Sequence, residues 1–410
     1  MTIASDRRVV ITGMGAVGPH GLGAEALWRR LREGRGMIAP LRHPDGERLR
    51  TKIAAQVPAE TDLAAGIDER TLPLLDRVSM MALGAAREAI GQSGLDFTND
   101  GLGLRTAVII GSGVGGDSTH DEQSRRLYAE NATRTHPFTI VRLMLNAPAS
   151  QISIAWGLRG PTFAVASACA STNHAVIQAA QMIRSGMADV AITGGTEACI
   201  SYSALRAWEA MRVLADDTCR PFSANRRGLV LGEGAGVFVL ESMERAQARG
   251  AIILAELAGG GMSADASDIV MPSAEGATTA MRQALAEAGL DPQDVDYVNA
   301  HGTGTAANDA TETRAIRLAF GEHADRLAVS STKSMHGHAL GASGALELVA
   351  AIGALRDGVV PPTMNLDQPD PQCDLDYVPG TAREMPVRAV LSNSFAFGGL
   401  NAVLALRRAP

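Results

Sequence analysis

Short runs of apolar residues alternate along the chain with longer segments whose apolar residues recur at helical spacing. The apolar runs predict strands at residues 8–12, 106–110, 162–166, 190–193, 295–299 and 327–330. The longer segments predict helices at residues 24–33, 170–184, 310–320 and 340–355. Alternation of this kind is typical of βα units, in which helices cover both faces of a parallel sheet. The pattern therefore predicts an α/β fold.

Two of these units resemble each other. Residues 163–186 and 327–358 each run from a strand through a short polar segment into a long helix rich in small residues, which ends before a glycine. Such self-similarity indicates an internal duplication, and the small side chains predict that both helices are central and buried. The best boundary follows a predicted strand at 252–257. We therefore divide the chain into residues 1–257 and 258–410.

Composition narrows the classes of protein that fit. The 410 residues are 46% hydrophobic and 20% charged, which is typical of a globular rather than a disordered chain. The net charge of −7 provides no general basic field for nucleic acid or anionic lipid. No apolar run reaches the length of a membrane span, and the apolar stretch after Arg8 is interrupted by glycines, so it predicts a buried strand rather than a signal peptide.

The cysteines and glycines exclude some kinds of site. Four irregularly spaced cysteines indicate neither a disulfide framework nor a zinc site, and they fit a reducing cytoplasm. Two G-x-G-x-x-G matches, at 13–18 and 111–116, follow predicted strands. In a dinucleotide site a helix opens inside this motif and an acidic residue follows about twenty positions later. After Gly18 a proline and further glycines precede a basic helix, so we interpret both motifs as structural turns.

Cys169 lies at a predicted strand-to-helix junction, in a segment of small residues from 163 to 174. A thiol at a helix N-terminus faces unpaired N–H groups and the positive end of the helix dipole, which lowers its pKa. A buried structural cysteine is the alternative, and this segment alone does not decide between them. Cys199, Cys219 and Cys373 lack a comparable setting, and we expect them to be inert.

Two distant histidines favour the catalytic alternative. His301 follows the strand at 295–299, at the end where open α/β sheets place their ligands, and His338 lies between a strand and a long helix. A cysteine nucleophile needs histidines of this kind, an acyl-accepting pocket and donors for an oxyanion. The loop Phe397-Gly398-Gly399 offers such a donor and a bulky gate, although an ordinary turn between two strands is also consistent with it.

Taken together, these segments resemble the β-ketoacyl-acyl carrier protein synthases of the synthase I/II type, which are elongating condensing enzymes. The resemblance covers essentially the whole chain. It is carried by residues 9–18, 111–116, the Cys169 segment, 220–222, 231–236, both histidine motifs and the final loop. It implies a thiolase-like fold, in which two similar βα halves form five layers, α-β-α-β-α, and a homodimer.

The resemblance also implies a reaction. Cys169 would take the acyl chain from a carrier protein as a thioester, with the backbone N–H groups of Cys169 and Phe397 as the oxyanion hole. His301 and His338 would bind the malonyl thioester carbonyl and promote decarboxylation. The resulting enolate would attack the acyl-cysteine and give a 3-oxoacyl-carrier protein two carbons longer, as in fatty acid biosynthesis.

Further roles follow from the same resemblance. Lys333 and Glu347 would organise the histidines, and Asp309 would be a structural acid. Thr303 and Thr305 would bind the phosphopantetheine arm, and Val114 and Trp208 would line the acyl pocket. Trp208 stands where a smaller aromatic is usual, which suggests a shortened chain cavity. No metal and no separate cofactor are implied, because the substrates travel on the phosphopantetheine of acyl carrier protein.

The implied partner is an acidic acyl carrier protein, and the candidate residues that would meet it are Arg125, Arg126, Arg134 and Arg212. Neither nucleic acid nor a membrane is expected as a partner. A ketosynthase of a specialised polyketide or modified fatty acyl pathway would keep the same triad of Cys169, His301 and His338. The sequence therefore does not decide which pathway the enzyme serves. A non-catalytic chain-length subunit would lack the nucleophile, and Cys169 argues against it. A degradative thiolase would carry a second cysteine in the final loop, and an initiating type III synthase would replace one histidine with asparagine.

Overall fold

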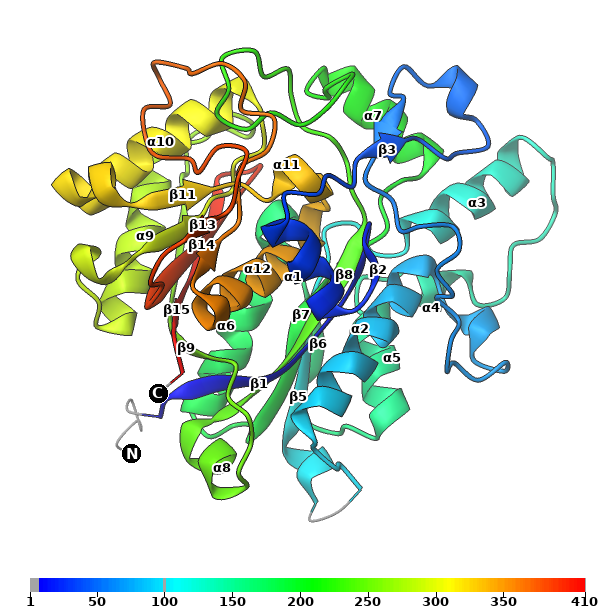
Figure 1. Cartoon of the computed structure of the whole chain (residues 1–410). Helices are drawn as coiled ribbons and strands as arrows, with labels where there is room; N and C mark the ends of the chain where they lie inside the picture. The colour runs from blue at the N-terminus through cyan, green and yellow to red at the C-terminus, as the bar shows by residue number, and fades with distance from the viewer. Residues whose placement is uncertain (1–6, 99–100, 410) are drawn as a thin grey trace.

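The computed structural model describes residues 7–98 and 101–409 of the chain, and a long mixed sheet runs through them (Figure 1). In the N-terminal half the strands lie in the order β6-β5-β7-β8-β1. Their bounds are β1 Val9–Gly18, β5 Thr106–Gly111, β6 Thr162–Val165, β7 Val190–Glu197 and β8 Gly234–Ser242. In the C-terminal half the order is β11-β10-β14-β15-β9. Their bounds are β9 Ala255–Ala264, β10 Tyr297–Asn299, β11 Ala328–Ser330, β14 Ala389–Ala396 and β15 Leu400–Arg407.

The two halves have the same topology. Numbered within each half, both strand orders read 3-2-4-5-1. In each half the second strand is parallel to the third and the fourth, and the fifth is antiparallel to the fourth and the first. β1 and β9 pair antiparallel and join the halves. The internal duplication predicted from the repeated units is therefore present in the fold.

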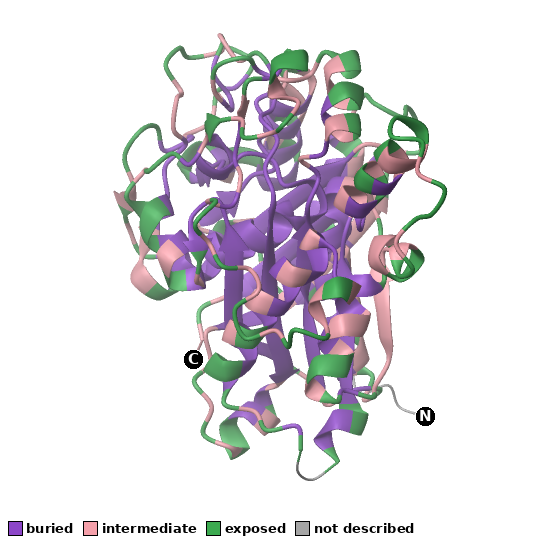
Figure 2. Ribbon diagram, turned by 90° about the vertical axis from the view of Figure 1, so that its right-hand side faces the viewer, coloured by how far each residue is buried: buried purple, intermediate pink, exposed green. Residues whose placement is uncertain are grey.

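Helices complete the layers. α6 (Ser171–Arg184) and α12 (Ser343–Asp357) contact each other and strands of both halves. α2 (Arg77–Ser93) and α5 (Ala147–Trp156) cover the outer face of the N-terminal half, and α9 (Ala274–Ala288) and α10 (Ala306–Phe320) lie on the outside of the C-terminal half. Residues 343–355 of α12 are all buried, and Figure 2 shows the buried strands and helices inside an exposed outer shell. The predicted five-layer, thiolase-like α/β fold is confirmed.

The remaining helices and strands complete the structure, and one of them, the buried helix at 333–336, carries Lys333. The helices are α1 Ala24–Arg32, α3 Asp117–Tyr128, α4 Thr139–Leu143, α7 Tyr202–Met211, α8 Met243–Ala248 and α11 Lys333–His336. The short strands are β2 Gly21–Leu22, β3 Ala39–Pro40, β4 Ile53–Ala54, β12 Val359–Val360 and β13 Arg383–Glu384. Among the described residues, no helix has the length and apolar character needed to cross a membrane.

Glycines in the strands correct two details of the sequence interpretation. The first G-x-G-x-x-G motif lies inside β1 rather than in a turn. Glycine is needed at position 13 because a Cβ there would come within 2.1 Å of a carbonyl oxygen of α2. Similarly, β9 continues past Leu257 to Ala264. Glycine is needed at position 261 because a Cβ there would come within 1.9 Å of a carbonyl oxygen of α9. In both strands glycine lets a helix pack closely on the sheet. The division at 257/258 falls inside β9 and stays a prediction.

Candidate active site

Cys169 lies in a tight turn between β6 and α6. The turn is a 3₁₀ segment, Ala168–Ala170, and Ala168 has a left-handed φ of 48°. A Cβ on Gly111, at the end of the neighbouring β5, would lie 2.5 Å from the Ser171 carbonyl, so only glycine lets α6 begin here. Gly111 opens the second G-x-G-x-x-G motif, which is therefore structural. The turn holds Cys169 in a buried position, with 6% of its surface exposed.

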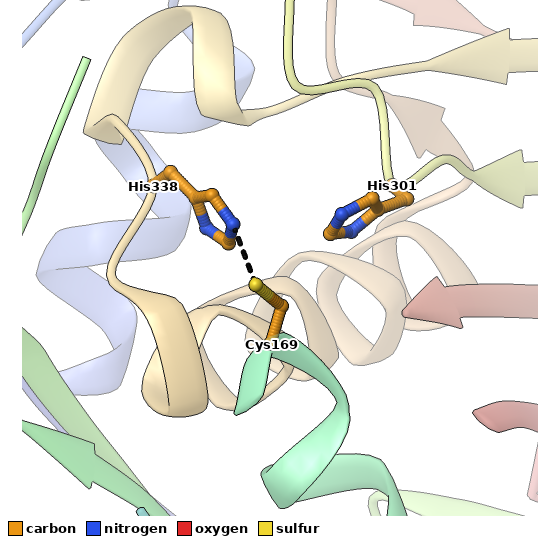
Figure 3. A group of neighbouring side chains, drawn as sticks. All are labelled: Cys169, His301 and His338. Carbon is orange, nitrogen blue, oxygen red and sulfur yellow. Dashed lines mark hydrogen bonds between the residues drawn. The ribbon is translucent and has the colours of Figure 1, made fainter. Parts of the chain in front are cut away.

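His338 contacts the nucleophile directly. Its backbone N–H donates to the Val230 carbonyl and its own carbonyl accepts from Gly232, which fixes the loop beside the 229–232 segment. The Nε2 atom lies 3.1 Å from the Cys169 Sγ, and Figure 3 shows this contact. The Nδ1 atom lies 2.7 Å from the Ser343 hydroxyl at the start of α12. A hydroxyl can donate or accept, so Ser343 supports either tautomer of His338.

His301 lies across the same cavity, just after β10. Its backbone N–H and that of Gly302 donate to the buried Glu312 carboxylate at 2.8 and 2.7 Å. Asn393 of β14 donates to the same carboxylate at 3.1 Å. Glu312 therefore holds the His301 turn against the sheet. Glu312 could not be predicted from the sequence, because an acidic residue inside the helical pattern of 310–320 gives no sign that it faces inward.

A buried ion pair supports His301 from behind. The Lys333 Nζ pairs with Glu347 of α12, donates to the His301 carbonyl at 2.6 Å and lies 3.4 Å from the His301 Nδ1. An ammonium can only donate, so the Nδ1 of His301 must accept and its proton must sit on Nε2. Among the described residues, that Nε2 atom has no hydrogen-bond partner. His301 is thus oriented as an N–H donor toward the cavity.

The charge states of the triad follow from burial. Burial and the nearby Lys333 ammonium hold the pKa values of His301 and His338 well below the ordinary range, so both rings are neutral. Burial also raises the pKa of the Cys169 thiol to about 12, although Lys333 acts in the opposite direction. The lowering expected from the helix N-terminus was therefore wrong for the free enzyme. The loss of hydration on burial is the largest influence on the pKa of this thiol.

One cavity joins the triad to the predicted substrate residues. Its walls include Cys169, His301 and His338 together with Thr303, Thr305, Trp208 and Phe397. The Trp208 and Phe397 rings stack with centroids 5.9 Å apart. The Phe397 segment is a turn that connects β14 to β15. The two interpretations offered for it, a bulky gate and an ordinary turn between two strands, are therefore compatible. The oxyanion, gate and phosphopantetheine roles stay predictions.

Val114 does not line this cavity. Its side chain is 45% exposed, and its backbone N–H donates to the buried Glu197 carboxylate at 3.2 Å. Glu197 also accepts from Gly113 and Gly341, and burial raises its pKa to about 7. This carboxylate ties the loop after β5 to the turn before α12. The assignment of Val114 to an acyl pocket stays a prediction.

The other predicted residues are placed as follows. Asp309 is buried and accepts from the backbone of Phe222 and Gly304 at 2.7 and 3.2 Å, which fits a structural acid; burial raises its pKa to about 6. Arg125, Arg134 and Arg212 are exposed, and Arg126 is half-buried. Arg125 pairs with Glu130 at 3.5 Å. Carrier-protein docking at these arginines stays a prediction.

The family follows from comparison with known proteins. Residues 6–246 match the Beta-ketoacyl synthase, N-terminal domain, and residues 254–367 match the Beta-ketoacyl synthase, C-terminal domain. The chain belongs to the β-ketoacyl synthase family. The predicted family resemblance is thus confirmed, and the chain is an enzyme of the acyl-condensing type.

Similar β-ketoacyl synthases carry different names. Nodulation protein E of Rhizobium meliloti (strain 1021) is 51% identical over 98% of this chain and 100% of its own. The 3-oxoacyl-[acyl-carrier-protein] synthase 2 of Coxiella burnetii is 42% identical over 98% of this chain and 99% of its own, which supports the synthase I/II type. A solved chain of the ishigamide ketosynthase/chain length factor superposes with a TM-score of 0.93 at 37% identity, covering 98% of this chain and 100% of that one.

Proposed function

We propose that the chain is a 3-oxoacyl-[acyl-carrier-protein] synthase that uses Cys169 as its nucleophile. The supporting observation is that the Cys169 sulfur and one nitrogen of each of His301 and His338 lie within 4.8 Å of one another beside a single cavity. A thiol, a neutral histidine that can change tautomer and a second histidine fixed as a donor are the groups that acyl transfer and enolate formation require.

In the first half-reaction, the Cys169 sulfur attacks the thioester carbonyl of an acyl-carrier protein. His338 Nε2, 3.1 Å away, accepts the thiol proton and then gives it to the departing pantetheine thiol. The backbone N–H groups of Cys169 and Phe397 bind the oxyanion. A neutral resting pair suits this step, because the neutral His338 Nε2 can accept the thiol proton as the sulfur bonds to the carbonyl carbon.

In the second half-reaction, malonyl-carrier protein enters with its arm against Thr303 and Thr305. His301 and His338 donate from Nε2 to the thioester carbonyl oxygen, which stabilises the enolate as the carboxylate leaves as CO₂. The enolate carbon attacks the acyl-cysteine carbonyl, and the Cys169 sulfur leaves as a thiolate that takes up one proton from solvent. The product is a 3-oxoacyl chain two carbons longer. Lys333 and Glu347 do not react, because neither lines the cavity: Lys333 contacts His301, and Glu347 pairs with Lys333.

Incubation with malonyl-carrier protein and a series of acyl-carrier proteins tests the proposal. Mass spectrometry should find an acyl adduct on Cys169 and 3-oxoacyl products. Cys169→Ala should lose both, while Cys199→Ala, which alters a buried cysteine outside the cavity, should retain both. An adduct on another residue, or condensation by Cys169→Ala, would disprove the assignment.

The pathway is a second question. The higher identity to a protein named for nodulation than to a 3-oxoacyl-ACP synthase 2 favours a specialised acyl chain over general fatty acid synthesis. The same assay separates these possibilities if it includes unsaturated and oxo-substituted acyl-carrier proteins. Preference for plain saturated chains would favour general fatty acid synthesis, and preference for modified chains would favour the specialised pathway.

We further propose that the enzyme acts in the cytoplasm as a homodimer that pairs through β6. β6 pairs only with β5 among the described strands, and its four residues are half-buried. α5 packs on β6 and leaves Ile154 73% exposed. An unpaired, partly apolar edge strand is a template for pairing with another chain. Light scattering should give a dimer that Ala164→Pro disrupts, and a monomeric wild type would exclude the homodimer.

A further inference from the structure

The triad has the composition of a soft-metal site. Cys sulfur and imidazole nitrogen are the ligands that Zn²⁺ prefers, and three protein ligands with an open fourth position are typical of reactive zinc sites. Cys169, His301 and His338 are all buried, and their ligand atoms lie within 4.8 Å of one another. Figure 3 shows both rings beside the sulfur.

The distances nearly suit a tetrahedral ion. Zinc–ligand bond lengths place neighbouring ligand atoms about 3.3–3.6 Å apart. The Cys169 Sγ and His338 Nε2 are already 3.1 Å apart. The widest pair in the group would have to close by about 1.5 Å at most. Side-chain rotation of His301 supplies a movement of that size, so geometry alone does not keep a metal out.

Lys333 is the obstacle. To bind a metal through Nε2, a neutral His301 must carry its proton on Nδ1. That proton would then point at the Lys333 ammonium, 3.4 Å away, which offers no acceptor. The buried ammonium also repels a cation, and burial strengthens that repulsion. Ser343 presents no such obstacle to His338, since its hydroxyl can accept from Nδ1–H.

We propose that Cys169, His301 and His338 form a latent Zn²⁺ site that Lys333 keeps closed. Replacing Lys333 by a neutral residue opens the site. Zn²⁺ then bonds to the sulfur as the thiol proton leaves to solvent, the two Nε2 lone pairs coordinate, and water takes the fourth position. Lys333 would thus protect the nucleophile from metals as well as orient His301.

Two variants test the proposal. Lys333→Met removes the ammonium but leaves Glu347 buried without its partner, whereas Lys333→Met/Glu347→Gln removes both charges and avoids that penalty. Circular dichroism and thermal melting establish which variants are folded. Lys52→Met is the matched control, because Lys52 is the only other lysine in the chain and is exposed.

The readouts are Zn²⁺ content after equilibrium dialysis and the thiolate-to-cobalt absorption band after addition of Co²⁺. The folded double variant should bind one ion per chain about 10–100-fold more tightly than the wild type and Lys52→Met. Adding Cys169→Ser should abolish the cobalt band.

Three results would overturn the proposal: wild type that binds as tightly as the variant, a folded double variant that binds no more metal than wild type, or a cobalt band that survives loss of Cys169. None of these measurements depends on condensation. Failure here is therefore distinct from failure of the proposed function.

Discussion

The resting state of Cys169 offers a sharp test of how burial controls this site. Burial raises the thiol pKa from 9.0 to about 12. A difference of three units lowers the thiolate fraction at neutral pH about 1000-fold, which corresponds to about 4 kcal/mol. A helix N-terminus favours the anion by about 2 kcal/mol at most. The balance therefore predicts a protonated thiol in the free enzyme.

The assay is the rate of Cys169 alkylation by iodoacetamide, followed by mass spectrometry so that the other cysteines are counted separately. The rate should rise about tenfold per pH unit up to about pH 10 without a plateau, because only the thiolate reacts. The more basic sulfur is also intrinsically more nucleophilic, which restores about 20-fold. The net rate at about pH 8 should be about 50-fold below that of an unperturbed thiol.

Two comparisons make the result decisive. The urea-unfolded chain should show a plateau near the ordinary thiol pKa, which calibrates the reagent. Lys333→Met should slow alkylation of the folded protein further, because the ammonium lowers the Cys169 pKa. A plateau at or below about pH 7 in the folded wild type would refute the reasoning, since it would reveal a preformed thiolate paired with an imidazolium.

Three further predictions concern other parts of the site. Trp208→Ala should extend the range of accepted acyl chains, because it removes a large ring from the cavity wall, and identical product profiles would exclude this role. Arg134→Glu and Arg212→Glu should raise the KM for carrier-bound substrate, most strongly at low salt, with kcat unchanged; no change in KM would exclude docking there. Glu312→Ala should lower the free energy of unfolding by about 3 kcal/mol, since three buried donors lose their acceptor, and should lower kcat by releasing His301. Urea denaturation measures it, Glu275→Ala is the exposed control, and equal effects of both would contradict the argument.

Much of the fold could be predicted from local pattern. The helix predicted at 170–184 begins at Ser171, and the helix predicted at 340–355 is a 3₁₀ turn followed by α12. These elements could be predicted because apolar periodicity and small residues are properties of neighbouring positions in the sequence. Strand lengths were harder to predict from the sequence. β9 continues through three glycines: Gly259 and Gly261 let α9 pack closely, and Gly260 faces Ile177 of α6, so the reason for all three lies elsewhere in the chain.

The site could be predicted only where its residues fall in recognisable motifs. Cys169, His301 and His338 are such residues, and the structure places them around one cavity. Ser343 and Glu312 are not, because their importance comes from which side chain or backbone group they meet across the fold. The Cys169 pKa could not be predicted for a related reason: the sequence shows the helix that follows the thiol but not how completely the chain buries it.

The duplication explains why three residues from distant segments meet. Each half contains an edge strand, a residue with left-handed φ, a 3₁₀ turn and a buried helix; Ala168 and Leu340 are the equivalent left-handed residues, with φ of 48° and 43°. The counterpart of Cys169 is therefore Gly341, where a Cβ would lie 2.5 Å from the Gly113 nitrogen. The Gly341 carbonyl accepts from the Thr172 hydroxyl at 2.5 Å, which joins the two turns. A side chain does not fit at Gly341, so at this position the N-terminal half supplies the nucleophile, while the C-terminal half supplies His338.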